Sequence, residues 1–262
     1  MHFRNDAYMI CCPARSGSTL LVHLLRSHPG ILSHGEILGK KITGLSGPLG
    51  KQFGKDPDAM HKLEAIRHAR PETYLYSCIL HPHGHQAVGF KLKYEELGSR
   101  RYRHTLDFIK ADTDLKIIFL DRENLFERYV SHYVAVHVTG VTLVQSNQPV
   151  PEVRPIKLKP ADIKRNFKEE LDKRRRFRKV FSSHRSIETT YEKLVADAVP
   201  EMNRIYGFLD LPEHAAATTT KKILDTRMAS FITNYAEILE YFSGTEYARY
   251  FAGSTCFDRQ PT

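Results

Sequence analysis

Residues 8–25 read YMICCPARSGSTLLVHLL and predict a strand, a loop and a helix in succession. The first five, YMICC, form an apolar run of strand length that Pro13 closes. A helix is expected from Ser18, because leucines recur at helical spacing until HPG at residues 28–30 ends the pattern. These leucines are Leu20, Leu21, Leu24 and Leu25.

The loop between this strand and helix, PARSGST at residues 13–19, has the composition of an anion-binding loop. Phosphate and sulfate bind where backbone N–H groups converge at a helix N-terminus, because these donors lack partners inside the helix and the dipole end is positive. Gly17 permits close approach of the backbone, and Arg15 can donate to two oxygens at once. Hydroxyl donors come from Ser16, Ser18 and Thr19.

The Walker A loop of nucleoside-triphosphate enzymes, GxxxxGK[ST], is the main alternative for this segment. The loop lacks the first glycine of that pattern, and Ser18 stands in place of its lysine. A P-loop nucleotide kinase would also need a magnesium ligand, and none is evident. A helix cap without a ligand stays open for the loop taken in isolation.

Further strands and helices alternate along the chain. Strands are expected at residues 88–93, 115–120 and 187–190, and helices at 57–68, 161–181, from 191, 200–208 and 228–242. This alternation predicts a single α/β domain over residues 1–262, a P-loop-like three-layer fold with a mostly parallel central sheet flanked by helices. Mobile loops are expected at residues 39–58 and 139–160, which are rich in Gly and Pro.

A second basic position follows the strand at residues 115–120. The sequence continues as DRENLFERYVSHY, which places Arg122 directly after the strand and Ser131 on the helix that leaves it. Open α/β sheets bind ligands at the carboxyl ends of their strands. Arg122 is therefore a second candidate anion site, with Arg128 on the same helix as a rival or as part of a solvated face.

These two segments together resemble the PAPS-dependent sulfotransferase family (PAPS is 3′-phosphoadenosine 5′-phosphosulfate). Its 5′-phosphosulfate loop has the form P-x-[RK]-S-G-[ST]-[ST], and its 3′-phosphate is bound by an Arg after a central strand and a Ser on the next helix. The resemblance implies that Arg15, Ser16, Gly17, Ser18 and Thr19 hold the phosphosulfate and that Arg122 and Ser131 hold the 3′-phosphate. The spacing from Arg122 to Ser131 resembles the bacterial branch that sulfates sugars and glycolipids.

The same resemblance implies an in-line transfer of the sulfuryl group to a hydroxyl of a sugar, glycolipid or small molecule, without a required metal. Glu36 is the first candidate for the general base, although a helix cap or a surface carboxylate also explains it, and His34 is the second. Lys91 resembles a family lysine near the transferring group, although an exposed strand residue explains it nearly as well. Arg15 is placed to stabilise the departing nucleotide, 3′-phosphoadenosine 5′-phosphate (PAP). Lys221 and Lys222 fall where some relatives place a late basic contact to the donor, although an ordinary surface pair also explains them.

The chain carries a formal net charge of +9 with a pI near 9.3, which favours anionic ligands. Much of this charge lies in the basic helix expected at residues 161–181. This helix is interpreted either as a solvated face or as a contact to an acidic substrate or lipid head group. A basic nucleic-acid-binding protein is the alternative class, although no nucleic-acid partner is expected. Peripheral contact with an anionic membrane also fits the charge.

The remaining composition narrows the class of protein. The cysteines show no paired CxxC spacing, so neither a zinc site nor a disulfide framework is indicated; they are Cys11, Cys12, Cys78 and Cys256. HPHGH at residues 81–85 lies in a loop without a nearby carboxylate, which disfavours a metal site. The first apolar run is too short for a signal sequence or membrane span, so we expect a cytoplasmic protein. Nothing indicates the oligomeric state.

Overall fold

The structure, a computed structural model of the 262-residue chain, describes residues 6–54, 56–141, 149, 151–217 and 230–251. The chain divides into two compact units. One comprises Met1–Asp121 and Arg175–Thr218, and the other comprises Arg122–Arg174 and Thr219–Thr262. The single sulfotransferase-like domain over the whole chain stays a prediction.

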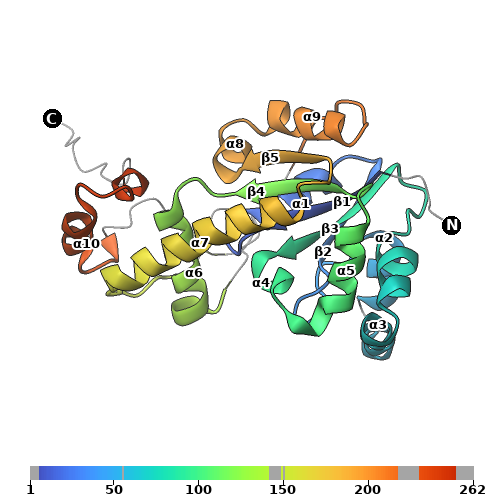
Figure 1. Cartoon of the computed structure of the whole chain (residues 1–262), viewed down its shortest axis with the longest axis horizontal. Helices are drawn as coiled ribbons and strands as arrows, with labels where there is room; N and C mark the ends of the chain where they lie inside the picture. Colours follow the sequence, from blue (N-terminus) through green and yellow to red (C-terminus); the bar gives the residue numbers. More distant parts are fainter. Residues whose placement is uncertain (1–5, 55, 142–148, 150, 218–229, 252–262) are drawn as a thin grey trace. The chain divides into compact units, whose positions relative to one another are not determined.

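A parallel β-sheet forms the centre of the first unit (Figure 1). Within the described residues it has five strands in the order β2-β3-β1-β4-β5, and every neighbouring pair is parallel. The strands are β1 (Asp6–Cys12), β2 (Ile31–Glu36), β3 (Ala87–Lys93), β4 (Lys116–Asp121) and β5 (Ser186–Thr190). The mostly parallel central sheet is therefore confirmed.

The two faces of this sheet pack against separate apolar cores. Met9 and Cys11 of β1 join one core, and Tyr8, Ile10 and Cys12 join the other, because successive side chains of a strand point to opposite faces. Strands covered on both faces read as continuous apolar runs. This is why residues 8–12 and 115–120 are recognisable from sequence.

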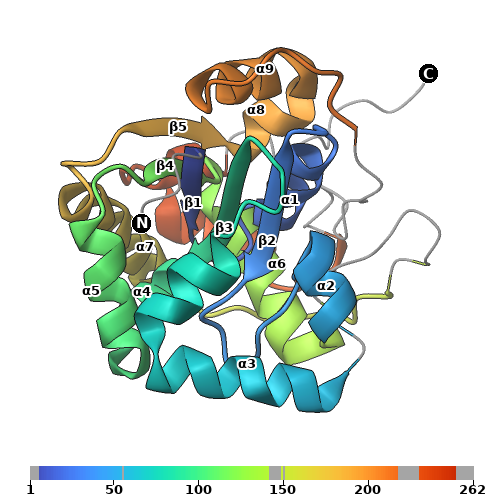
Figure 2. The ribbon, with the colours of Figure 1, turned by 90° about the vertical axis from the view of Figure 1, so that its right-hand side faces the viewer.

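Helices cover both faces, which confirms the predicted three-layer arrangement (Figure 2). One face carries α3 (Pro57–Ala69), the π-helical turn η1 (Thr73–Ile79), α4 (Tyr94–Leu97), α5 (Arg103–Ala111) and the end of α7 (Pro160–Val180). The other carries α1 (Ser18–Arg26), α8 (Tyr191–Ala196) and α9 (Ala198–Phe208). The helix α2 (Gly47–Phe53) and the short turn η2 (Arg100–Tyr102) complete the first unit.

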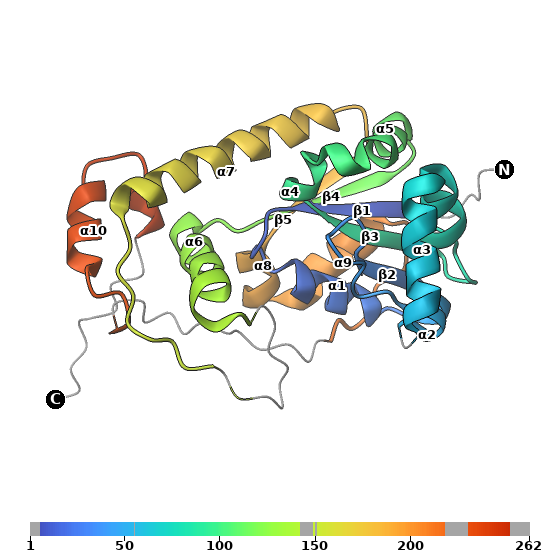
Figure 3. The same cartoon turned by 90° about the horizontal axis from the view of Figure 1, so that it is seen from below.

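The second unit is helical and has an aromatic core of its own. It contains α6 (Leu125–Val134), the π-helical turn η3 (Ala135–Thr139), the start of α7, α10 (Tyr235–Phe242) and η5 (Ala248–Tyr250). Phe167 of α7 packs against Phe242 of α10, with ring centroids 5.7 Å apart, and Figure 3 shows α10 beside the first turns of α7. A single bridge between Ile156 and Ile232 ties the segment before α7 to the segment before α10.

One strand has no counterpart among the predicted elements, and two predicted elements differ from the structure. Residues 31–36 form the strand β2, in which Ser33 and His34 break the apolar pattern although both are fully buried. The loop predicted at 39–58 contains α2 and the start of α3. Within the predicted helix 228–242, residues 228 and 229 lie outside the described residues and the helix itself begins only at Tyr235.

Candidate active site

The loop at residues 13–19 connects β1 to α1 in a conformation that gathers backbone donors. Arg15 and Gly17 both have left-handed backbone conformations, with φ of 68° and 85°. Such alternation of backbone handedness turns successive N–H groups toward one side and forms an anion-binding concavity. The first turn of α1 contains no acidic residue, so the positive end of the helix dipole is not neutralised from within.

The side chains of the loop are partly committed to holding its shape. Ser16 is fully buried, and its hydroxyl donates to the carbonyl of Pro13 at 3.0 Å. Ser18 is also buried, whereas Arg15 and Thr19 are half-buried. The hydrogen bond of Ser16 therefore helps to fix the shape of the loop.

Tyr191, the first residue of α8, packs directly on Gly17. A Cβ at position 17 would lie 2.4 Å from Cδ2 of the Tyr191 ring, so only glycine fits. Sequence reasoning missed Tyr191, because its partner lies far away in the chain and no local motif marks it.

Glu36 lies at the end of β2 and pairs with two lysines of the neighbouring strand. Its Oε1 is 3.1 Å from Nζ of Lys91, and its Oε2 is 2.8 Å from Nζ of Lys93. The register of the sheet explains the first pair, since Glu36 lies opposite Lys91, and Lys93 follows two residues later on the same face. Cys12, the last residue of β1, lies opposite Lys93, so the loop at residues 13–19 begins at this same edge of the sheet.

The lysines control the charge of Glu36. Burial acts to raise the pKa of Glu36, but Lys91 and Lys93 outweigh it and hold the pKa below its usual value. Lys91 is only 6% exposed, and its charge also lowers the pKa of His23 on α1, although burial is the larger cause there. The charge of Lys91 therefore affects the pKa of both Glu36 and His23.

His34 has a different environment although it lies on the same strand. It is fully buried, and its Nδ1 accepts a hydrogen bond from the backbone N–H of Ser46 at 3.1 Å. Burial, helped by the charge of Arg26, lowers the pKa of His34 to about 4. Of the two candidate bases, only Glu36 has exposed surface at the carboxyl edge of the sheet.

Arg122 and Ser131 lie in the second unit, and both are buried. The guanidinium of Arg122 forms an ion pair with Glu127, and the carbonyl of Arg122 accepts from Nη2 of Arg174 at 2.8 Å. Asn124 caps α6 by accepting from the N–H of Glu127 at 2.9 Å. Arg122 thus lies at the start of α6 with its carboxylate partner on the first turn of that helix.

Arg128 is not on a solvated face. It is 3% exposed, donates to Oδ1 of Asn166 and lies 3.7 Å from the Glu170 carboxylate, so it links α6 to α7 within the second unit. Periodicity alone did not reveal this burial, because a charged side chain on an amphipathic helix reads as exposed. Arg128 therefore stabilises the packing of α6 against α7 in the second unit.

The basic helix α7 is only partly a free cationic surface. Nε of Arg174 lies 3.4 Å from the carboxylate of Glu170. Arg178 binds both Asp121 and Glu188, at 2.6 and 2.7 Å. Arg175 and Arg176 are exposed. Two of the arginines that suggested nucleic-acid binding are therefore engaged within their own units.

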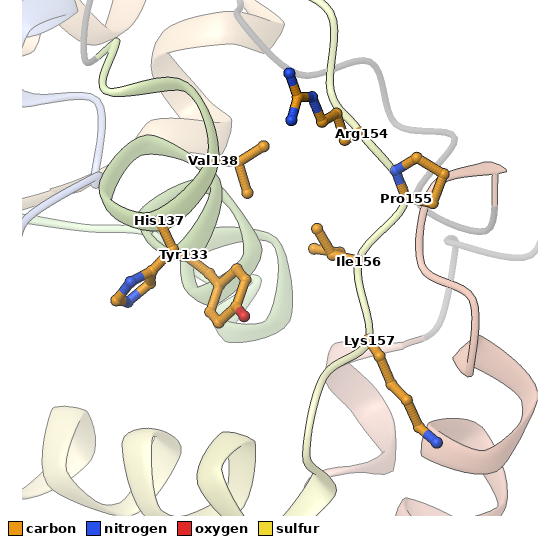
Figure 4. A pocket seen from close by; sticks show the side chains of 7 residues that line it. All are labelled: Tyr133, His137, Val138, Arg154, Pro155, Ile156 and Lys157. Atoms are coloured by element: carbon orange, nitrogen blue, oxygen red, sulfur yellow. The ribbon is translucent and has the colours of Figure 1, made fainter.

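A hollow of about 350 Å³ lies in the second unit between η3 and the segment before α7 (Figure 4). Tyr133, His137 and Val138 line it from the helical side, and Arg154, Pro155, Ile156 and Lys157 line it from the other. In Figure 4 the ring of Tyr133 points toward Ile156, whereas Lys157 extends away from the helix. The part of the predicted loop 139–160 that the structure describes thus forms the wall of a polar hollow.

Other sequence candidates add little to the site. The rings of His81 and His83 are 4.3 Å apart, but no group of three or more His, Cys, Asp or Glu side chains suited to a metal occurs among the described residues. Lys221 and Lys222 lie outside the described residues. Within the described part of the chain, no helix is both long and apolar enough to span a bilayer.

Comparison with known proteins gives one consistent family. A model of the sulfotransferase family matches residues 8–215. Nodulation protein H of Rhizobium meliloti (strain 1021) is 26% identical over 251 residues, which are 93% of this chain and 94% of that protein.

Two solved structures are also similar. Mouse sulfotransferase SULT7A1 complexed with PAP has a TM-score of 0.39 at 18% identity, covering 89% of this chain and 66% of that one. A sulfotransferase from Alicyclobacillus acidocaldarius has a TM-score of 0.47 at 17% identity, covering 95% and 99%.

Proposed function

Because this chain belongs to the sulfotransferase family and to its bacterial branch, we propose that it transfers the sulfuryl group of PAPS to a hydroxyl of a carbohydrate, glycolipid or small molecule. One observation carries the proposal. The PARSGST loop opens α1 at the carboxyl end of β1 with two left-handed residues and no acid in the first helical turn. This is a site for the phosphosulfate end of the donor.

In this proposal two sets of residues bind the two ends of the donor. Arg15 and the backbone and hydroxyl groups of residues 16–19 bind the 5′-phosphosulfate. Arg122 and Ser131 bind the 3′-phosphate, with Arg122 exchanging part of its pairing with Glu127 for the phosphate oxygens. A nucleotide with phosphates at both ends satisfies both sets, whereas ATP satisfies only one.

The reaction is an in-line displacement at sulfur. The acceptor oxygen forms a bond to sulfur while the bond from sulfur to the phosphate oxygen breaks, and the electron pair stays on that oxygen. Glu36 takes the proton of the acceptor hydroxyl, and Arg15 with the loop amides stabilises the charge on the departing phosphate. Lys91, already 3.1 Å from Glu36, neutralises the sulfuryl oxygens.

The acceptor class is proposed from the charge of the chain. Its formal net charge is +9. Such an excess of positive charge favours an acceptor that carries an anionic group. We therefore favour an acidic or membrane-associated carbohydrate among the acceptors.

Calorimetry with PAP and with ATP, both without added metal, tests the function. We expect PAP to bind selectively and Arg122→Ala to weaken it by about 10- to 100-fold, the loss of one hydrogen-bonded charge contact. Arg103→Ala is the matched control, because that side chain is 79% exposed on α5 and belongs to neither site. Equal affinity for ATP would favour the kinase alternative, and the absence of PAP binding would contradict the proposal.

A further inference from the structure

Lys93 and Glu96 form an arrangement at the end of β3 that the reaction scheme does not use. The Nζ of Lys93 lies between two carboxylates, 2.8 Å from Oε2 of Glu36 and 3.5 Å from Oε1 of Glu96. The backbone N–H of Lys93 also donates to Oε2 of Glu96 at 2.9 Å. Glu96 therefore holds Lys93 at both its main chain and its side chain.

Lys91 is held differently. Among the described residues its ammonium group has one ion-pair partner, Glu36, and no second carboxylate fixes it. Each oxygen of Glu36 thus faces a different lysine, one anchored and one not. The charge of this unanchored lysine also lowers the pKa of His23 on α1, after burial and the charge of Arg26.

The backbone keeps the two carboxylates close together. A Cβ on Gly39 would lie 3.4 Å from Oε1 of Glu96 and 3.5 Å from Oε2 of Glu36, so both oxygens approach the Gly39 main chain. Two carboxylates in such proximity raise each other's pKa, and a cation beside them opposes this effect. Lys93 is such a cation, because its Nζ lies near both carboxylates.

We propose that Lys93, anchored by Glu96, is a positioning residue that keeps the Glu36 carboxylate ionised and aimed at the acceptor while Lys91 leaves Glu36 for the sulfuryl oxygens of the donor. This inference rests on the proposed function. Without Lys93, the binding of donor would take from Glu36 the one remaining cation that fixes it. Among the described residues, the charged side chains that face Glu36 are Lys91 and Lys93 on β3 and, beyond Lys93, Glu96 on α4. The charge of Glu95 on α4 also acts on Lys93.

The charges of these groups, as well as their geometry, support separate roles for Lys93 and Lys91. Burial raises the pKa of Glu96, whereas the two lysines hold the pKa of Glu36 below its usual value. Burial would lower the pKa of Lys93, but its bond to Glu36 and the charge of Glu96 outweigh it and raise the pKa. Lys93 therefore stays charged throughout the pH range in which the enzyme would work.

The test is the titration of Glu36 in the full-length protein. Carbon-detected NMR follows the side-chain carboxyl, assigned by its loss in Glu36→Gln, and needs no substrate. In Lys93→Met we expect the Glu36 pKa to rise by about one unit, because one of two opposite charges is gone. Lys93→Arg should restore it, which separates the charge from a folding defect.

Turnover supplies the second readout. Transfer of ³⁵S from PAPS to N-acetylglucosamine, octyl glucoside or phenol is measured from pH 4.5 to 8.5. In Lys93→Met the acid limb of the pH profile should move to higher pH by the same unit, and turnover should recover at high pH. In Lys91→Met turnover should be lost at every pH. Glu96→Gln should lower turnover several-fold without raising the Glu36 pKa, because Lys93 keeps its charge but loses its anchor.

Glu95→Gln is the matched control, because Glu95 is exposed on the same helix and the change removes the same charge. An unchanged Glu36 titration in Lys93→Met, in a protein that binds PAP and transfers sulfate, would overturn this inference alone. If the wild-type protein neither bound PAP nor transferred sulfate, the proposed function would fail, and with it the assigned role of Lys93.

Discussion

Glu36 and His34 lie two residues apart on β2, and the pKa of each is lowered by a different cause. Two lysines keep the Glu36 carboxylate ionised, whereas burial keeps the His34 ring neutral down to a pKa of about 4. Both groups are therefore unprotonated at neutral pH. They differ in access, because His34 is fully buried and its Nδ1 already accepts from Ser46.

Substitution of each candidate base should affect a different property. Glu36→Gln should lower turnover by on the order of 10²- to 10⁴-fold, the usual contribution of a general base, while the dissociation constant for PAP stays nearly unchanged. His34→Gln should leave turnover within a few-fold of the wild type. Steady-state kinetics and PAP titration of both variants check this, and near-normal turnover of Glu36→Gln would remove Glu36 from the role.

The role of His34 should appear instead in the acid stability. The unfolded chain binds the His34 proton near pH 6.5 and the folded chain only near pH 4, so the free energy of unfolding falls as the pH is lowered through this window, by on the order of 3 kcal/mol. His34→Gln should flatten this fall, and the exposed His61→Gln should not. Denaturant unfolding at several pH values measures both.

The residues that sequence reasoning found are those that carry a local motif. Arg15 and its neighbours stand in a continuous heptapeptide, and Arg122 follows an obvious strand. Tyr191 and Lys93 were missed because their roles come from partners that are distant in the chain, Gly17 for the first and Glu36 for the second. Long-range pairing of this kind leaves no pattern in one sequence.

At the scale of elements, the strand, loop and helix around Gly17 were predictable and β2 was not. The first are marked by an apolar run and a leucine repeat, which follow from burial on both faces of the sheet. In β2 two of the buried positions are occupied by Ser33 and His34, and these polar residues interrupt the apolar run that would mark a strand. A functional strand that carries polar groups into the core departs from the pattern on which prediction depends.

Gly17→Ala should disturb the loop through two separate causes. Its φ of 85° is strained for any residue with a Cβ, by about 1–3 kcal/mol. The new methyl would also collide with the Tyr191 ring. We expect a lower unfolding temperature and weaker PAP binding, measured by calorimetry.

A double variant and a second glycine separate these causes. Gly17→Ala with Tyr191→Ala should recover the part of the stability lost to the collision but not the part lost to strain. Gly207→Ala is the control, because a Cβ there meets nothing within 4 Å and the glycine lies within α9. If Gly17→Ala matched this control, the loop would not depend on close packing.

At the scale of the whole molecule, the chain carries more positive charge than the arginines and lysines of the two proposed anion sites supply. The formal net charge is +9, and part of the basic helix is engaged in ion pairs within its unit, as Arg174 and Arg178 show. The remaining cations raise the potential that an anionic ligand meets on approach. This field acts over about one Debye length, roughly 10 Å at 0.1 M salt, and so depends on ionic strength.

Salt should therefore weaken the binding of PAP more than the binding of AMP, since AMP lacks the 3′-phosphate. Between 50 and 300 mM NaCl we expect the dissociation constant for PAP to rise several-fold and that for AMP to rise less. Arg122→Ala should reduce the PAP slope to that of AMP while leaving AMP itself unchanged, because only the 3′-phosphate uses Arg122. Parallel slopes for PAP and AMP in the wild-type protein would mean that the 3′-phosphate meets no dedicated cation, and that the positive charge serves a different ligand.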